Sequence, residues 1–138
     1  MTKEDLFNFI QKRELGVLGT IGPDGAPQSS LVGIAVTREL EIIFDTVKSS
    51  RKYRNLAARP VCSFAIGWEG EETVQFEGEA REPAGAELVH YQQVYFAKWP
   101  DGPSRLTWPG ITYFVVRPKW VRYSDFGQAP PKIQEFSF

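Results

Sequence analysis

The sequence predicts a mainly β protein of the α+β class, in which six or seven antiparallel strands close into a small barrel flanked by helices. Short apolar runs, several alternating with polar residues, are separated by brief turns rich in glycine and proline, whereas few segments carry a helical pattern. Glycines also stand inside the strand runs, where a small barrel needs tight bends, at Gly16, Gly19, Gly33 and Gly78. The length of 138 residues fits a single domain, 1–138.

The N-terminal third is expected to form a helix and a three-stranded meander. Residues 3–14 are amphipathic, and Thr2 can cap this helix with Asp5 three residues later. The run "GPDGAP" that follows the first strand marks a tight turn. Strands are expected at 15–21, 28–36 and 40–46, all antiparallel because their connections are too short for a crossover.

The middle of the chain predicts a helix and a hairpin. The helix, about 50–59, ends before Pro60, and strands 61–67 and 73–81 follow as a hairpin across "WEGEE". The second strand alternates. One of its faces carries Val74, Phe76 and Gly78, and the other carries Thr73, Gln75 and Glu77.

The C-terminal third predicts a helix over 84–98, an irregular loop over 99–110, and two last strands that flank Pro118. The tail is rich in proline but ends in "IQEFSF", so we expect it to dock on the domain. The loop carries Trp99, Trp108 and Arg105. These side chains could stack as a lid over a planar ring or plug a barrel mouth, and the sequence leaves both interpretations open.

The charge balance and the cysteine content narrow the functional class. Sixteen basic and seventeen acidic side chains give a net charge of −1, which argues against a general nucleic-acid or membrane-surface binder. Cys62 is the only cysteine and lies in the apolar run "VCSFAI", so we expect a buried thiol rather than a nucleophile. The absence of a disulfide pair, of a signal-like N-terminus and of a long apolar run predicts a cytoplasmic protein.

The start of the helix at 50–59 has an unusual charge. Its first turn opens with Arg51 and Lys52, although the positive end of the helix dipole favours acidic residues there. A phosphate bound at this end would make the position of both cations favourable. Backbone N–H groups, both cations and the hydroxyls of Thr46 and Ser50 could all bind it. The alternative is that Ser50 or its neighbour Ser49 is an ordinary N-cap and both cations point to solvent.

A longer pattern surrounds this helix start. A strand ends in aromatic-x-Thr ("FDT"), Ser-Arg-Lys opens the helix, and an apolar strand and "VQFEGEA" follow. In its order and spacing the run "GAPQSSLVGIAV…LEIIFDTVKSSRKYRNLAARPVCSFAI…TVQFEGEA" resembles the pyridoxamine 5'-phosphate oxidase-like flavoproteins, a family of FMN-binding split barrels. The resemblance covers residues 5–82 well and the last strands loosely. It implies a six- to seven-stranded antiparallel split β-barrel that binds FMN.

The resemblance assigns roles to particular positions. Arg51 and Lys52 would hold the FMN phosphate, with Ser50 and Thr46 beside them. The strand from Ser30 to Ala35 would run along the ribityl chain and the flavin ring and present its backbone, including that of Leu31 and Val32.

Three further positions complete the implied site. Asp45 stands with Thr46 where the next strand of the family touches the cofactor. Thr73 matches a family glutamine, and Gln75 lies two residues later on the same face, so either could reach the flavin. In this family the site is completed across a homodimer interface, which implies that the partner is a second copy of the chain.

The departures from the family pattern bear on the substrate. Ser30 stands where the B6 oxidases proper have an arginine, Ser124 stands at about the position of their C-terminal tryptophan, and their terminal Arg-x-His motif is absent. We therefore expect an FMN-dependent oxidoreductase that acts on a different small substrate or on a reduced nicotinamide. A flavin carrier or sensor without turnover is one alternative, and a split barrel that uses deazaflavin or haem is another. His90, the only histidine, keeps the haem alternative open, although a surface or interface role is more usual for such a residue and no metal site is expected.

Overall fold

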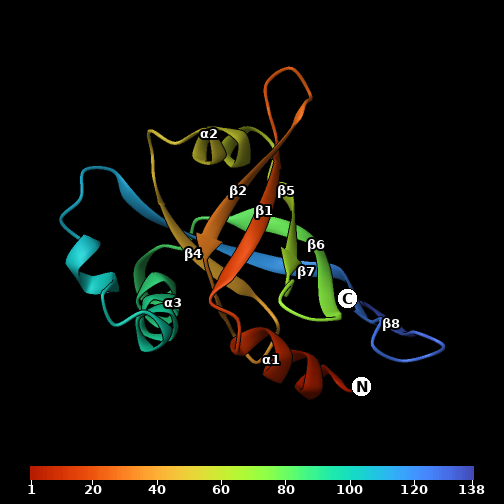
Figure 1. Cartoon of the computed structure of the whole chain (residues 1–138). Helices are drawn as coiled ribbons and strands as arrows, with labels where there is room; N and C mark the ends of the chain where they lie inside the picture. Colours follow the sequence, from red (N-terminus) through yellow and green to blue (C-terminus); the bar gives the residue numbers. More distant parts are fainter.

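The fold is a single curled antiparallel sheet with three helices around it (Figure 1). The computed structural model describes all 138 residues. In chain order the elements are α1 (Lys3–Gln11), β1 (Leu15–Ile21), β2 (Pro27–Gly33), β3 (Ala35–Val36), β4 (Ile42–Val47), α2 (Arg51–Ala58), β5 (Val61–Ile66), β6 (Glu72–Arg81), α3 (Gly85–Lys98), the 3-10 helix η1 (Gly102–Arg105), β7 (Ile111–Asp125) and β8 (Lys132–Ser137).

The strand order explains why the barrel is split. Hydrogen-bonded neighbours run β2-β1-β5-β6-β7-β4-β3, and β8 pairs with β7 outside this path. All pairs are antiparallel, which confirms the predicted fold class. The two edge strands, β2 and β3, come from one stretch of chain that is interrupted at Ile34. The sheet curls until β2 comes against β4, but the structure has no ladder between these two strands, so the barrel stays open along this line.

The alternation of the sequence determines which side chains fill the barrel. In β6, Val74, Phe76 and Gly78 are buried and Gln75 and Glu77 are exposed, as predicted. The same alternation recurs in β5. The result is a core of 22 buried residues inside the curl, and a second cluster of six buried residues joins α3 to β3, β4 and β7.

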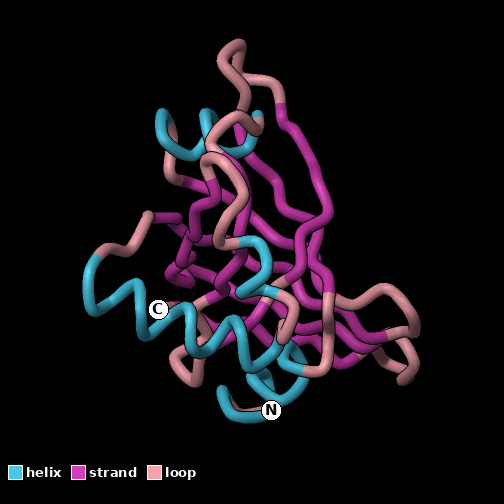
Figure 2. The backbone as a smooth tube through the Cα atoms, turned by 90° about the vertical axis from the view of Figure 1, so that its left-hand side faces the viewer, coloured by secondary structure: helices cyan, strands magenta, loops and turns pink.

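The helices cover three parts of the sheet. In Figure 1, α1 lies below the curl, α2 lies across its upper end beside β1 and β2, and α3 lies at its side; Figure 2 shows α3 from the front. The predicted cap of α1 is confirmed, because the backbone N–H of Asp5 donates to Thr2 Oγ1 (3.1 Å) and the backbone N–H of Thr2 donates to Asp5 Oδ2 (2.7 Å). None of these helices is both long and apolar enough to cross a membrane.

Several predicted boundaries and pairings are wrong in detail. The first helix ends at Gln11 rather than at 14, and the expected strand 28–36 breaks into β2 and β3. The expected three-stranded meander does not form, because β4 pairs with β3 and β7 rather than with the strand before the break. The kink at Ile34 carries the chain from one sheet edge to the other, so β3 and β4 form a separate hairpin.

The last strands also differ from the expectation. Residues on both sides of Pro118 belong to one continuous strand, β7. Its pairing with β6 shifts register there, because the consecutive residues Glu77 and Gly78 pair with Trp120 and Pro118 and leave Lys119 without a partner position. Gly78 permits this close pairing, because a Cβ at this position would lie 2.2 Å from the carbonyl oxygen of Arg117. The tail docks as predicted and forms β8 along the outer part of β7.

Candidate functional site

The open line of the barrel exposes the edge of β2. This strand pairs only with β1, so the backbone N–H and C=O groups of its other edge have no strand partner. The opposite side of the opening is β4, which leads directly into α2. A ligand in this opening would meet backbone groups along its length and a helix N-terminus at its end.

The helix start has the serine N-cap of the alternative interpretation, with Arg51 exposed and Lys52 half-buried, and the phosphate interpretation stays a prediction. Ser50 is the N-cap, with its Oγ accepting a hydrogen bond from the backbone N–H of Tyr53 (3.2 Å). The Oγ1 of Thr46 lies 3.0 Å from the same Ser50 Oγ. Thus the expected grouping of Thr46 and Ser50 at the helix start is present, while the N–H groups of Arg51 and Lys52 keep no partner inside the helix.

A small polar pocket lies between this helix start and the barrel. It has a volume of about 190 Å³ and no apolar residue in its lining, which consists of Thr20, Gln28, Ser29, Ser30, Arg51 and Lys52. Neither cation of this pocket is in an ion pair. Nearly every group in the lining can donate a hydrogen bond, so the pocket suits an anion rich in oxygen atoms.

A buried asparagine of α2 holds the helix against the two strands that line the pocket. The Nδ2 of Asn55 donates to Thr20 Oγ1 (3.0 Å) and to Gln28 Oε1 (2.8 Å), and only 4% of the residue is exposed. Thr20 and Gln28 are themselves a cross-strand pair of β1 and β2. The clamp therefore holds the helix against the end of the hairpin and shapes the floor of the pocket.

Sequence reasoning missed four residues of this arrangement: Thr20, Gln28, Ser29 and Asn55. One signal was available, because Asn55 precedes the buried Leu56 on the apolar side of a short helix, where a polar side chain needs a partner. No local pattern, however, indicates that its partners come from β1 and β2.

The residues predicted along the flavin alternate about the edge strand. Ser30 lines the polar pocket, Leu31 is 61% exposed and points away from the core, and Val32 is buried in the core. The backbone of Leu31 and Val32 lies on the free edge of β2, and the predicted contact of this backbone with a flavin stays a prediction.

Asp45 has partners within the chain. Its Oδ2 accepts a hydrogen bond from Arg105 Nε at 2.9 Å, with 16% and 15% of the two side chains exposed. The hydroxyl of Tyr95 lies 3.3 Å from Asp45 Oδ1 and 3.2 Å from the carbonyl oxygen of Gly33. Both atoms are acceptors, so the single hydroxyl proton serves one of them at a time and links β4 to β2 from the side of α3. This carboxylate orders the wall of the opening.

Thr73 and Gln75 lie elsewhere within one chain. Both are on the outer face of β6, and β1 and β5 separate this strand from β2. Three strand spacings amount to about 14 Å. The single chain thus brings Ser30, Arg51 and Lys52 into one pocket lining, while Thr46 and Ser50 contact each other at the helix start outside that lining. Thr73 and Gln75 do not join them.

The remaining candidates take clear places. Cys62 is buried, as expected, and its burial raises the pKa of the thiol to about 12. His90 is exposed on α3, and the structure has no group of three or more His, Cys, Asp or Glu arranged to hold a metal. Trp99 donates from Nε1 to the carbonyl oxygen of Ile34 (3.0 Å) and packs against Gly33, whereas Trp108 is 53% exposed. Trp99 therefore seals the kink between the two edge strands.

Comparison with known proteins identifies the family. The family model described as pyridoxamine 5'-phosphate oxidase matches residues 2–125. The chain belongs to this family. A pyridoxine/pyridoxamine 5'-phosphate oxidase of Burkholderia lata is 33% identical over 140 residues, which cover 94% of this chain. The chain spans only 64% of that relative's length.

Solved structures share the fold of this family member but differ in what their names say they bind. A haem-binding protein from Mycobacterium smegmatis superposes with a TM-score of 0.84 at 19% identity, over 99% of this chain and 58% of that chain. A pyridoxamine 5'-phosphate oxidase-related, FMN-binding protein from Nostoc punctiforme has a TM-score of 0.66 at 12% identity, over 91% and 87% of the two chains. An F420 reductase has a TM-score of 0.62 at 25% identity, over 83% and 93%. The names of these proteins therefore differ in cofactor although the fold is shared. The cofactor of this chain has to be inferred from the residues of its own pocket.

Proposed function

We propose that this family member is an FMN-binding flavoprotein and acts as an oxidoreductase on a small substrate or a reduced nicotinamide. The observation that carries the proposal is the polar pocket at the start of α2, in which two cations without carboxylate partners face hydroxyl and amide groups. A phosphate dianion would gain charge-assisted hydrogen bonds there and would also offset the unfavourable position of both cations at the positive end of the helix.

The opening beside the pocket suits the remainder of FMN. The free edge of β2 would offer backbone groups to the flavin, and Thr46 and Ser50 would stand next to the phosphate. When bound, FMN supplies the electron-transfer chemistry, and the chain supplies binding, orientation and exclusion of water. The protein groups that would tune the ring are backbone groups of β2, because Leu31 points away from the core and Val32 into it.

The site is proposed to be completed by a second copy of the chain. Thr73 and Gln75 lie on the outer face of the sheet and could meet the flavin of a partner. The same face is apolar and exposed at Leu31 (61%), Val61 (43%) and Leu15 (39%). Light scattering at micromolar concentration should give twice the 15.6 kDa of the chain, and a monomeric mass would contradict the shared site.

Haem and the deazaflavin F420 are the other candidates that the structural neighbours raise. A haem site with a histidine ligand would need His90, which is exposed on α3. The visible spectrum of the purified protein separates these candidates. Yellow protein that releases FMN on denaturation supports the proposal, and a Soret band would replace it with haem. Bleaching of the yellow by reduced nicotinamide, with recovery in air, would distinguish an oxidoreductase from a passive binder.

The decisive variant is Arg51→Ala combined with Lys52→Ala. Each charge-assisted hydrogen bond contributes about 1.5–3 kcal/mol, so we expect the affinity for FMN, measured by flavin fluorescence quenching, to fall at least about tenfold. The free energy of unfolding without ligand should stay the same or rise by a few tenths of a kcal/mol, because the unfavourable helix-end charges are gone. Lys12→Ala combined with Arg38→Ala, which removes two cations outside the pocket, is the matched control. Equal FMN affinity of the site variant and the control would refute the phosphate assignment.

A further inference from the structure

One side chain of α3 reaches both sides of the opening between β2 and β4. The hydroxyl of Tyr95 lies 3.2 Å from the carbonyl oxygen of Gly33, the last residue of β2, and 3.3 Å from Oδ1 of Asp45 on β4. Only 1% of Tyr95 is exposed, and its ring belongs to the second buried cluster. Since no ladder joins β2 to β4, this fixed hydroxyl is a direct link between the two borders of the opening.

The register of the β1–β2 hairpin determines which backbone groups of β2 point into the opening. The N–H of Ile34 donates to the carbonyl oxygen of Glu14 (2.9 Å), and β2 pairs with β1 in an unbroken register. In an antiparallel pair, residues that exchange hydrogen bonds with the partner strand alternate with residues that do not. Ile34 is of the first kind, so Gly33 and Leu31 are of the second kind and turn their N–H and C=O groups away from β1.

The hydroxyl of Tyr95 changes the order of donors and acceptors along this edge. While it donates to the carbonyl oxygen of Gly33, the edge keeps the N–H and C=O of Leu31 and the N–H of Gly33. Asp45 competes for the hydroxyl proton, but the ion pair with Arg105 (2.9 Å) already neutralises its charge. The groups left for a ligand are therefore a donor, an acceptor and a donor, in this order along the chain.

A second side chain of α3 holds the next carbonyl group in the same way. Trp99 donates from Nε1 to the carbonyl oxygen of Ile34 (3.0 Å), and its ring packs so closely that a Cβ at Gly33 would lie 2.9 Å from Cζ2. Position 33 thus has no room for a side chain that could cover its N–H. Tyr95 and Trp99 together fix the end of β2 through its carbonyl groups and leave the N–H of Gly33 to a ligand.

We propose that Tyr95 is a positioning residue that orders the free edge of β2 for the pyrimidine edge of a flavin. This inference rests on the proposed flavin function and adds the orientation of the ring to it. The pyrimidine edge presents a carbonyl, the N3–H and a second carbonyl, which is the order complementary to the groups left by Leu31 and Gly33. An unbound carbonyl at Gly33 would add an acceptor beside a flavin carbonyl, so the hydroxyl of Tyr95 removes a repulsive contact.

The test compares FMN with 3-methyl-FMN, in which a methyl group replaces the hydrogen on N3. In the unaltered protein, fluorescence quenching should give a dissociation constant for 3-methyl-FMN at least about tenfold above that for FMN, because the methyl group removes the donor that faces the C=O of Leu31 and crowds the strand edge. Tyr95→Phe keeps the ring and removes the hydroxyl. The dissociation constant for FMN should then rise about threefold to tenfold, and the ratio between the two flavins should fall to about threefold or less because the edge is no longer held.

Tyr91→Phe is the matched control on the same helix. The hydroxyl of Tyr91 binds Glu41 and Arg81 and has no contact with β2, so this variant should keep both the FMN affinity and the ratio of the unaltered protein. A loss of packing alone would weaken the binding of both flavins equally and leave the ratio unchanged. Circular dichroism establishes that each variant is folded.

The possible results separate this inference from the function on which it rests. Absence of FMN binding to the unaltered protein would refute the proposed function and the inference together. FMN binding with equal affinity for 3-methyl-FMN would overturn the orientation of the ring and leave the phosphate assignment standing. A ratio that survives Tyr95→Phe would overturn the role of Tyr95.

Discussion

The two helices at the open side of the barrel differ in how their charges are neutralised. At α2, five cations between Lys48 and Arg59 have no carboxylate partner. At α3 and η1, charged side chains are bound to one another: Arg105 contacts both Asp45 and Asp101. The comparison teaches that charge alone does not indicate a ligand site. We propose a ligand site where like charges cluster without partners, and a structural role where charged side chains are paired with one another.

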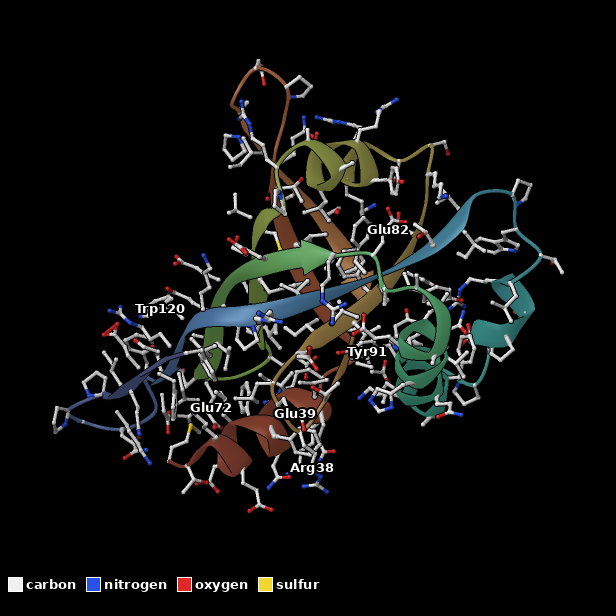
Figure 3. All side chains as sticks on the ribbon, turned by 180° about the vertical axis from the view of Figure 1, so that it is seen from behind. Arg38, Glu39, Glu72, Glu82, Tyr91 and Trp120 are labelled. Atoms are coloured by element: carbon white, nitrogen blue, oxygen red, sulfur yellow. The ribbon has the colours of Figure 1, made fainter.

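The α3 side holds a chain of such contacts. The hydroxyl of Tyr91 donates to Glu41 Oε2 (2.9 Å) and accepts from Arg81 Nη2 (3.3 Å), and Arg81 also pairs with Glu87. Figure 3 shows Tyr91 on α3 and Glu82 nearer α2. Glu82 accepts hydrogen bonds from the hydroxyls of Tyr53 (3.0 Å) and Thr112 (2.6 Å), so it ties α2 to β7 without reaching the cations of the helix start.

The largest effect on stability is expected on the paired side. Arg105→Ala leaves the largely buried carboxylate of Asp45 without its cation, and the free energy of unfolding should fall by about 3 kcal/mol. Urea unfolding at neutral pH measures this loss. Asp101→Ala removes the other partner of Arg105, which is 64% exposed, and should cost less than about 1 kcal/mol. If both variants lost the same free energy of unfolding, the ion pair of Arg105 with Asp45 would not be the stabilising contact of this side.

The next largest effect belongs to the clamp under α2. Asn55→Ala leaves the buried Thr20 and the side chain of Gln28 without their donor, which should lower the free energy of unfolding by about 2 kcal/mol. The FMN affinity should fall as well, because the floor of the pocket is no longer held. Asn8→Ala on the surface of α1 is the matched control and should change stability by less than about 0.5 kcal/mol. If Asn55→Ala also changed the free energy of unfolding by less than about 0.5 kcal/mol, the clamp would not organise the site.

The smallest expected effect is a loss of stability at alkaline pH. Burial and the nearby charge of Asp45 raise the pKa of Tyr95 above its ordinary value, and the same two causes act on Tyr113. Below about pH 10 the hydroxyls of both tyrosines keep their protons in the folded and in the unfolded chain. Their contribution to the free energy of unfolding should therefore be constant in that range. Above that pH the unfolded chain loses protons that the folded chain retains, and stability should fall by about 1 kcal/mol per pH unit for each tyrosine. In urea unfolding from pH 8 to 11, Tyr95→Phe should flatten this decline, and an unchanged decline would exclude Tyr95 as its source.

Local signals predicted the start of α2 well. Ser50 caps it, Thr46 stands beside Ser50, and both cations open the first turn, all of which is encoded within seven residues. The side chains that line the pocket together with Arg51 and Lys52 come from β1 and β2, more than twenty positions away. Alternation predicted the faces of β6, but it could not show that β4 pairs with β7 across more than sixty residues. The pairing of Asp45 with Arg105 is equally distant, so a residue assigned to the cofactor by resemblance also has a structural partner that no motif reveals.

The alternation of side chains along β2 has a consequence for how this protein can vary. Because side chains alternate along a strand, an insertion or deletion of a single residue between Pro27 and Gly33 would turn over the side chains on one side of the change. With the turn end of the hairpin kept in register, a change just before Ser30 would turn Ser30 outward and Leu31 toward the polar pocket. We expect substitutions to be tolerated in this segment far more readily than changes in its length.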